Sequence, residues 1–422
     1  MSQDLSPHDS HDPTSSGLSR RSLMIGAAAG VLGAAAGTVT TSAAARTSTL
    51  AATAPAPPLV PLWKTAGHRG ILYGSSTATW QISDKAYSRL YTRHPAILFT
   101  EDDMLWYRLK PTPKSDLDFT YPDQIVEYAE DRNMLVFGAH LVWDEGFGDG
   151  WSDSDLWDIH EKRARKLLYG TMRRLMHRYR GRVAIWSVVN EAIVNGPDVG
   201  FHGLRTDVPW YHTIGPEYVA HAFHVAHEVD PRACLVMNDF GYETINQYGD
   251  KAVDKQRHTL QVLDRLLGRG VPVDAFGIQA HLLAERFADR FHTRQYRRFL
   301  SELADRGLKI LITEMDVLDD GLPRNPSRRD AMVADVYRRY LDCALDEPAV
   351  ASLITFGLSD RYTWLQEDYP REDGAARRPL PFNAHLKPKP AFHALHHALR
   401  QAPRRWPMFD APRHVNTKDV PR

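Results

Sequence analysis

The stretch Val183-Ala-Ile-Trp-Ser-Val-Val-Asn-Glu191 is an apolar run, rich in β-branched residues, that ends in a carboxylate. A second run of the same kind, Leu308-Lys-Ile-Leu-Ile-Thr-Glu314, continues as Met-Asp-Val317. Such runs are typical of strands buried on both faces, whereas an amphipathic helix would space its apolar residues three and four apart. Each glutamate therefore stands where a buried strand leaves the hydrophobic layer.

Short apolar runs alternate with longer helical segments from Gly70 onward. The expected strands are 71–75, 97–100, 135–142, 183–189, 234–237, 275–279, 310–314 and 353–357, and the expected helices are 155–180, 216–229, 255–267, 293–306, 328–345 and one that begins near Pro390. This alternation favours an α/β fold with a parallel sheet, and eight strands close naturally into a (β/α)8 TIM barrel. An open doubly wound sheet is the alternative, but it would want a glycine-rich phosphate turn after an early strand, and the sequence has none.

Polar side chains gather at the ends of five predicted strands, where a barrel has its catalytic rim. They are Asn190 and Glu191, Asn238 and Asp239, Gln279 and His281, Glu314 and Asp316, and Ser359 and Asp360. Residues two apart on a strand share a face, so each of the third and fourth pairs should point the same way. Two carboxylates on different strands are what cleavage of a glycosidic bond requires, one as acid and one as nucleophile or base.

At this point the chain resembles glycoside hydrolase family 10, the family of endo-1,4-β-xylanases. Residues 186–191, Trp-Ser-Val-Val-Asn-Glu, match its acid/base motif, and residues 312–317, Ile-Thr-Glu-Met-Asp-Val, match its nucleophile motif. Supporting matches are Gly277-Ile-Gln-Ala-His281, Asn238-Asp239, Lys387-Pro-Lys-Pro-Ala-Phe392 and a degraded second-strand motif, Glu101-Asp-Asp-Met-Leu-Trp106. The likeness runs in order from about residue 66 to residue 400.

The resemblance implies a retaining glycoside hydrolase that cleaves a β-glycosidic bond in xylan or a related β-glycoside by double displacement. Glu191 would be the acid/base and Glu314 the nucleophile. His281 would form hydrogen bonds with Glu314 and with Asp316, and Asn190 would form one with the sugar 2-hydroxyl. The other substrate contacts that the resemblance implies come from Gln279, Trp143, Trp364, Phe356, Glu101 and Asn238.

The chain departs from the family's pattern where the cleft grips the sugars on the non-reducing side. Asp102 and Leu105 stand where the family has Asn and Lys, Ala139 stands where it has His, and Phe356 replaces a Trp. Losing the Lys and the His removes hydrogen bonds of ~1–3 kcal/mol each if a sugar hydroxyl is then left unpaired. A decorated xylan or a glycosylated natural product therefore remains open as the substrate.

Three further departures lie near the same strands. His140 replaces a Thr, Asp144 replaces a second His, and Ser187 stands for the Asp of the acid/base motif. Because adjacent strand residues face opposite ways, we expect His140 to point outside the barrel unless a bulge shifts the register.

The N-terminal part of the chain differs in composition from the rest. Ser19-Arg20-Arg21-Ser22 precedes an Ala/Gly-rich apolar run, and Ala43-Ala-Ala45 offers a cleavage site. We expect a twin-arginine-type signal peptide over 1–45, a linker over 46–65, the catalytic barrel over 66–402 and a loose tail over 403–422. The protein is thus expected to be secreted. A membrane anchor is the alternative, although the run is short for a bilayer span.

The amino-acid composition indicates which classes of partner and ligand the protein is expected to bind. The 422 residues carry 52 basic and 52 acidic side chains, so neither a nucleic acid nor an anionic membrane is expected. Cys234 and Cys343 are expected as separate buried thiols, with a disulfide still open in an exported protein. His221, His224 and His227 recur in one predicted helix without a carboxylate at ligand spacing, which favours a solvated face. We expect a monomer without a metal or cofactor.

Two rival readings stay open. One is a non-catalytic carbohydrate-binding barrel, although the presence of both glutamates with Asn190, His281 and Asp316 argues against it. The other is an inverting hydrolase, whose carboxyl groups would stand ~6.5–9.5 Å apart rather than the ~5–5.5 Å of a retaining enzyme.

Overall fold

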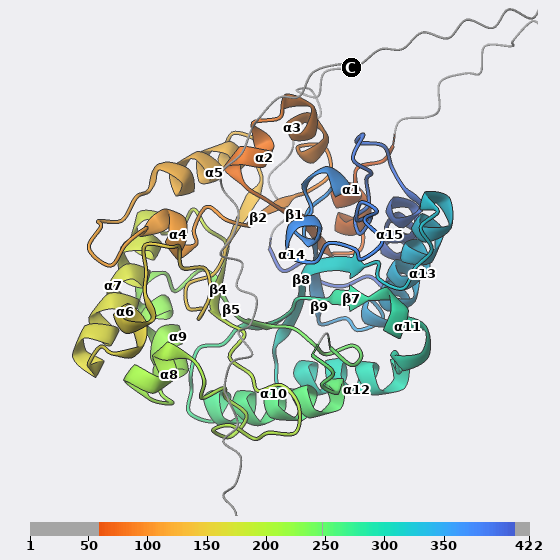
Figure 1. Cartoon of the computed structure of the whole chain (residues 1–422). Coiled ribbons are helices and arrows are strands. Elements are labelled where there is room, and N and C mark those ends of the chain that lie inside the picture. Colours follow the sequence, from red (N-terminus) through yellow and green to blue (C-terminus); the bar gives the residue numbers. More distant parts are fainter. Residues whose placement is uncertain (1–58, 247, 410–422) are drawn as a thin grey trace, which may run out of the picture. The chain divides into compact units, whose positions relative to one another are not determined.

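The computed structural model describes residues 59–246 and 248–409, and the signal-peptide segment lies outside them. The compact unit that begins at Pro61 contains a closed barrel of eight parallel strands (Figure 1). In chain order the barrel strands are β1 (Leu72–Thr77), β2 (Ile97–Thr100), β3 (Leu135–Gly138), β4 (Ile185–Asn190), β5 (Cys234–Asp239), β6 (Ala275–Ile278), β8 (Lys309–Leu318) and β9 (Val350–Thr355). Each pairs with the next, β9 pairs with β1, and the short β7 (His281–Leu283) adds to β8. The predicted TIM barrel is confirmed.

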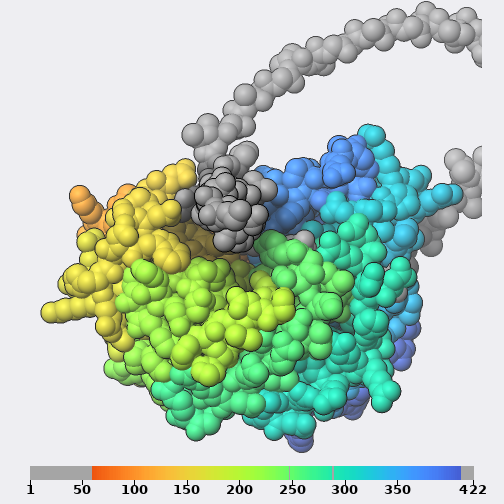
Figure 2. Space-filling view, turned by 60° about the horizontal axis from the view of Figure 1, so that its bottom comes forward, coloured from red at the N-terminus to blue at the C-terminus, as the bar shows by residue number. Residues whose placement is uncertain are grey.

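Helices follow the strands and surround the barrel (Figure 1). The longer ones are α5 (Thr120–Glu130), α7 (Glu161–Arg178), α9 (Tyr218–Val229), α10 (Ala252–Leu267), α12 (Thr293–Asp305), α13 (Pro326–Ala344) and α15 (Pro390–Gln401). The shorter ones are α1 (Leu62–Gly67), α2 (Thr79–Ile82), α3 (Lys85–Tyr91), α4 (Trp106–Leu109), α6 (Asp153–Trp157), α8 (Pro209–Ile214), α11 (Ala284–Arg290), α14 (Leu365–Asp368) and the 3₁₀ turn η1 (Asp360–Tyr362). In Figure 2 the segments follow one another around the visible face in chain order, from yellow through green to blue. None of the described helices has the length and apolar character needed to cross a bilayer.

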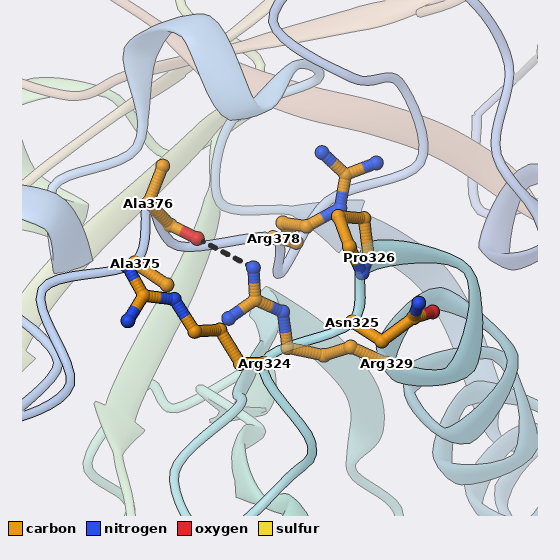
Figure 3. Close-up of a pocket in the computed structure, with 7 residues that line it drawn as sticks. All are labelled: Arg324, Asn325, Pro326, Arg329, Ala375, Ala376 and Arg378. Atoms are coloured by element: carbon orange, nitrogen blue, oxygen red, sulfur yellow. Dashed lines mark hydrogen bonds between the residues drawn. The ribbon is translucent and has the colours of Figure 1, made fainter.

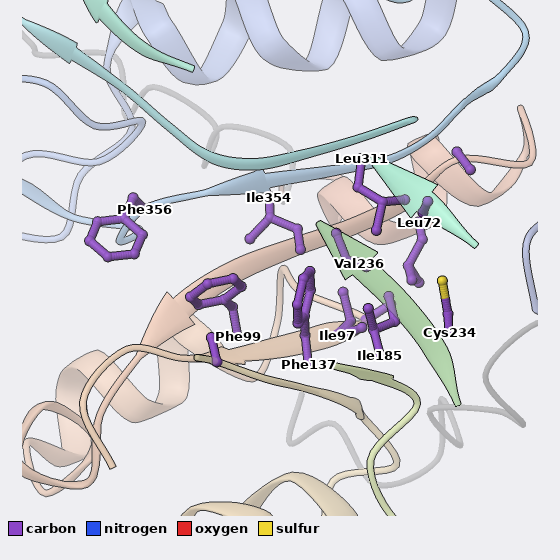
Figure 4. Close-up of a cluster of buried hydrophobic side chains, with 14 residues drawn as sticks. Leu72, Ile97, Phe99, Phe137, Ile185, Cys234, Val236, Leu311, Ile354 and Phe356 are labelled. Carbon is purple, nitrogen blue, oxygen red and sulfur yellow. The ribbon is translucent and has the colours of Figure 1, made fainter. Parts of the chain in front are cut away.

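The barrel interior is filled by apolar side chains from all eight strands and the turns that follow them (Figure 4). Phe99 packs on Phe137 with ring centroids 4.8 Å apart and on Phe356 at 6.0 Å. Ala139 and Phe356, two of the positions that depart from the family's pattern, belong to this cluster. Cys234 also belongs to it, and both Cys234 and Cys343 are buried free thiols, as expected.

Three boundaries differ from the expectation. The predicted helix 155–180 is divided between α6 and α7, because the His160 side chain accepts the Arg163 N–H and caps α7. The linker ends before residue 65, since α1 begins at Leu62. Arg405, which was expected in the loose tail, is held by the barrel, because its guanidinium donates to the carbonyls of Leu345 and Glu347. Residues 410–422 lie outside the described part.

Candidate active site

Glu191 and Glu314 reach the same end of the barrel from different strands. Glu191 directly follows β4 with a left-handed backbone (φ 55°), which is uncommon for a side chain with a Cβ and suits the turn that ends the strand. Its N–H donates to the Asn238 carbonyl at 2.9 Å, while the Glu314 N–H donates to the Gln279 carbonyl at the same distance. Both peptide groups are thus tied to the strands between them, β5 and β6.

Side-chain amides connect the two carboxylates. Gln279 Nε2 lies 2.9 Å from Glu191 Oε1 and 3.3 Å from Asn190 Oδ1. Asn238 Nδ2 lies 2.8 Å from Asn190 Oδ1 and 2.8 Å from Glu314 Oε1. A continuous set of hydrogen bonds therefore runs from one glutamate to the other, and all five predicted residues come together at one site.

Glu314 is held from a second side by an imidazole. His281 Nε2 lies 3.4 Å from Glu314 Oε2, and its Nδ1 lies 2.8 Å from Asp316 Oδ1. Trp364 Nε1 donates to the other Asp316 oxygen at 2.8 Å. Burial disfavours the imidazolium, but Asp316 and Glu314 outweigh it and raise the pKa of His281 to about 10. His281 is therefore a cation between two carboxylates at neutral pH.

Glu191 has its own donors. Trp143 Nε1 donates to Glu191 Oε2 at 3.1 Å, and Arg205 Nη1 donates to the Glu191 carbonyl at 3.0 Å. Arg205 also holds Asp144 at 2.8 Å. Burial raises the pKa of Asp144, Arg205 opposes this, and the charge of Glu191 adds to it. The sequence offered no signal for Arg205, which lies in a loop without periodicity.

His140 points into the site, not outside the barrel. Its Nδ1 lies 2.8 Å from Ser187 Oγ, and its Nε2 lies 3.9 Å from Glu314 Oε1. The expectation failed because the regular β3 ladder ends at Gly138 and resumes only as a bridge between Val142 and Val189. Strand alternation therefore does not extend through residue 140.

Glu101, which was predicted to contact the substrate, lies apart from this network. Its oxygens accept hydrogen bonds from Ser76 Oγ at 2.6 Å and Gln81 Nε2 at 3.0 Å. Burial, followed by the charge of Asp102, raises the pKa of Glu101 far above its ordinary value. Glu101 can therefore act as a neutral hydrogen-bond donor near neutral pH.

Two polar strand ends serve the scaffold. Asp239 lies 2.8 Å from the buried Lys255, and its other oxygen accepts the Ile193 N–H at 2.9 Å. Asp360 pairs with Lys389 at 2.8 Å. Neither contacts the glutamates directly. In the described part of the chain, no group of three or more His, Cys, Asp and Glu side chains is arranged to hold a metal ion.

Phe356, one of the positions that depart from the family's pattern, contacts two residues of the site. Phe356 meets the edge of His281 at 5.5 Å and of Trp364 at 6.1 Å between ring centroids. Leu105 and Ala139 are both buried, with 6% and 1% exposure. Thr313, to which the sequence analysis assigned no role, donates to Asn238 Oδ1 at 2.7 Å and thereby orients that amide.

Known proteins resemble this chain over almost the whole barrel. The family model of glycosyl hydrolase family 10 matches residues 62–398. Endo-1,4-beta-xylanase B of Thermotoga neapolitana is 31% identical over 337 residues, which is 79% of this chain and 89% of that protein. The structure of xylanase 10B from Thermotoga maritima matches with a TM-score of 0.69 and 30% identity, covering 81% of this chain and 98% of that one. Xylanase 10B from Thermotoga petrophila RKU-1, in complex with xylobiose, matches with a TM-score of 0.70 and 29% identity, covering 82% and 99%. The chain belongs to glycosyl hydrolase family 10.

Proposed function

We propose that this glycoside hydrolase cleaves β-1,4 bonds between xylose units, with Glu191 as acid/base and Glu314 as nucleophile. The observation that carries the proposal is the hydrogen-bonded path from Glu191 through Gln279, Asn190 and Asn238 to Glu314. The substrate class is supported by the xylanase names of the relatives and by the xylobiose complex of one structural neighbour.

In the first step, Glu314 attacks the anomeric carbon while Glu191 gives its proton to the departing glycosidic oxygen. The bond to the leaving sugar breaks and a glycosyl–Glu314 ester forms. In the second step, Glu191 takes a proton from water, the water oxygen attacks the anomeric carbon, and Glu314 leaves as a carboxylate. Two inversions give net retention.

The surrounding residues fit supporting roles in these steps. His281 and Asp316 fix the orientation of Glu314, and the positive charge of His281 lies beside the attacking carboxylate. Trp143 holds Glu191 through its indole N–H. Asn190 offers an amide to the sugar 2-hydroxyl, a contact that strengthens in the transition state. The remaining substrate contacts that we propose come from Gln279, Asn238, Trp143, Trp364, Phe356 and Glu101.

The test is an assay of the purified chain on xylan and on aryl β-xylosides, with proton NMR of the first product. We expect the β-anomer to appear first. Glu191→Gln should lower kcat by about 10²–10⁴-fold on xylan, because proton transfer to the leaving oxygen is lost. An α-anomer as first product would identify an inverting enzyme instead. If the parent binds oligosaccharide without hydrolysing it, and Glu191→Gln binds it equally well, the protein is a carbohydrate-binding barrel instead of an enzyme.

A decorated xylan or another β-glycoside is the second candidate. It is favoured by the buried Leu105 and Ala139, which offer no hydrogen-bonding side chain where the family has Lys and His. Comparison of kcat/KM on aryl β-xylosides, aryl β-glucosides and branched xylo-oligosaccharides separates the candidates.

We also propose that the chain is exported as a folded monomer by a twin-arginine signal over 1–45. The exported barrel binds neither nucleic acid nor, after the signal is cleaved, a membrane. The Arg20-Arg21 pair and the following apolar run support this proposal. Replacing both arginines by lysine should retain the protein inside the cell. Sedimentation of the exported product tests its monomeric state.

A further inference from the structure

A cavity of about 540 Å³ opens where the segment after β8 meets the segment after β9 (Figure 3). Arg324, Arg329 and Arg378 line it together with Asn325 and Pro326 from the start of α13. Its lining residues, all in the described part of the chain, include no carboxylate. Arg324 and Arg329 thus bring two guanidinium groups to a space large enough for a small ligand, while the Arg378 guanidinium is turned toward Asp330.

The carboxylates nearest to this cavity are already paired with arginines. The pairs, with their shortest N···O distances, are Arg378–Asp330 at 2.6 Å, Arg371–Asp373 at 2.8 Å and Arg377–Asp319 at 3.0 Å. Asp330 and Asp373 are thus held by Arg378 and Arg371, whereas Asp319 is shared between Arg377 and Arg329.

Arg329 is a buried cation with an unused donor. Its side chain is 2% exposed, Nη2 donates to the Ala376 carbonyl at 2.9 Å, and Nε lies 3.2 Å from Asp319. Nη1 has no hydrogen-bond partner among the described residues. Burial lowers the pKa of Arg329, Asp319 opposes this, and Arg371 and Arg378 lower it further. An anion would relieve both the unmet donor and the crowding of positive charge.

Arg324 and the N-terminus of α13 add to the positive electrostatic potential in the cavity. Arg324 is exposed and forms no ion pair within the described ranges, and Figure 3 draws its side chain beside that of Arg329. The cavity also lies at the N-terminus of the 19-residue helix α13, with Pro326 in its first turn. That end of a helix carries a partial positive charge and favours anions.

We propose that this cavity binds an oxyanion, either the carboxylate of an acidic sugar or a phosphate, through the side chains of Arg324 and Arg329. Both lining segments follow the carboxyl ends of β8 and β9, the end of the barrel that carries the two glutamates. A uronic-acid branch on a polysaccharide is thus one source of the anion and free phosphate is the other. Only the first source depends on the proposed hydrolysis of a β-glycoside.

The binding test is calorimetric titration of the full chain with inorganic phosphate and with methyl glucuronide. We expect saturable binding of at least one, weakened about tenfold in Arg324→Ala, as for the loss of one charge-assisted contact. Ala376→Glu should abolish binding by placing a carboxylate at the cavity without removing an arginine. Arg328→Ala is the matched control, because Arg328 is an exposed arginine in the first turn of α13, close to Arg324 in the chain, but does not line the cavity.

The source of the anion follows from hydrolysis of xylo-oligosaccharides with and without a uronic-acid branch. If the branch enters the cavity, Arg324→Ala raises KM for the branched substrate only. If phosphate is the ligand, Arg324→Ala leaves KM unchanged for both substrates, while phosphate binding is weakened. The proposal is overturned if neither anion binds the parent, or if Arg324→Ala and Arg328→Ala weaken binding equally. These two overturning outcomes are measured by titration, so they test the proposed anion site even if the protein hydrolyses none of the substrates.

Discussion

His140 and Ser187 are bonded side chain to side chain, with Nδ1 and Oγ 2.8 Å apart. This bond fixes an imidazole whose other nitrogen lies 3.9 Å from Glu314 Oε1. Glu314 therefore has a histidine on each side, His281 at one oxygen and His140 near the other. His140 stands where the family's pattern has a Thr, so an imidazole takes the place of a hydroxyl beside the proposed nucleophile.

A double-mutant cycle of His140→Ala and Ser187→Ala tests this pair. We expect a coupling energy of about 0.5–1.5 kcal/mol in urea unfolding, the range for one buried hydrogen bond. Ser187→Ala should also lower kcat more than it changes KM, because a released imidazole no longer holds its place beside Glu314. The control is Ser352→Ala, which removes a buried serine hydrogen bond to Leu72 and should leave kcat unchanged. Additive effects in the cycle would contradict the coupling.

His281 predicts a specific dependence of stability on pH. Its pKa is about 10 in the folded protein and near 6.5 when unfolded, so its contribution is complete below pH 6.5 and is lost as pH rises to about 10. Relative to a His281→Gln variant, the parent should lose up to ~1.4 kcal/mol of unfolding free energy per pH unit across this window. Urea unfolding of both proteins at a series of pH values measures the slope. Parallel curves would mean that His281 is neutral in the folded state.

Gly277 is required by the amide that connects the two glutamates. A Cβ at this position would stand 2.3 Å from Asn238 Oδ1 and 3.1 Å from the Thr313 side chain. Gly277→Ala should therefore displace Asn238, cost about 1–3 kcal/mol of stability and lower kcat. Gly170→Ala is the control, since nothing lies within 4 Å of its Cβ in α7, and it should stabilise the protein by about 0.5–1 kcal/mol. Equal kcat in the Gly277 variant and the parent would rule out this dependence on Asn238.

The buried pair Lys255–Asp239 should be costly to break from one side. Lys255 also donates to the Ile193 carbonyl at 2.7 Å, and Ile193 lies in the segment directly after Glu191. Lys255→Met would leave Asp239 buried without its cation, and we expect a loss of about 3–5 kcal/mol in chemical denaturation. Arg297→Met removes the exposed pair with Asp346 and should cost less than about 1 kcal/mol. Similar losses in the two variants would contradict the burial argument.

Much of the fold could be predicted because its strands are apolar and short. Every expected strand overlaps an observed one, and β2 has the predicted bounds, Ile97–Thr100. Glu314 and Asp316 both lie beside His281, as strand alternation predicted, although the register of β8 against β9 shifts between Ile312 and Met315. These are features that local spacing determines.

Features that depend on contacts between residues far apart in the chain could not be predicted from local sequence spacing. His140 enters the site because the ladder between β3 and β4 is interrupted, and that interruption leaves no mark in the run Gly138-Ala-His. Asp239 ends a strand just as Glu191 does, yet Lys255, 16 residues later in the chain, turns it into a structural ion pair. Arg405 follows a Pro-containing stretch but is anchored by carbonyls of the helix–strand turn before β9.

Closure of the barrel also constrains how the chain is made. β1 pairs with β9, so Leu72 meets Ser352 only after nearly the whole barrel sequence has been synthesised. Until then a nascent chain on the ribosome carries β1 and β8 as open sheet edges, which are prone to pair with other chains. Fragments that stop before Val350 should aggregate rather than fold, and chaperones that shield sheet edges should be needed until the last strand emerges.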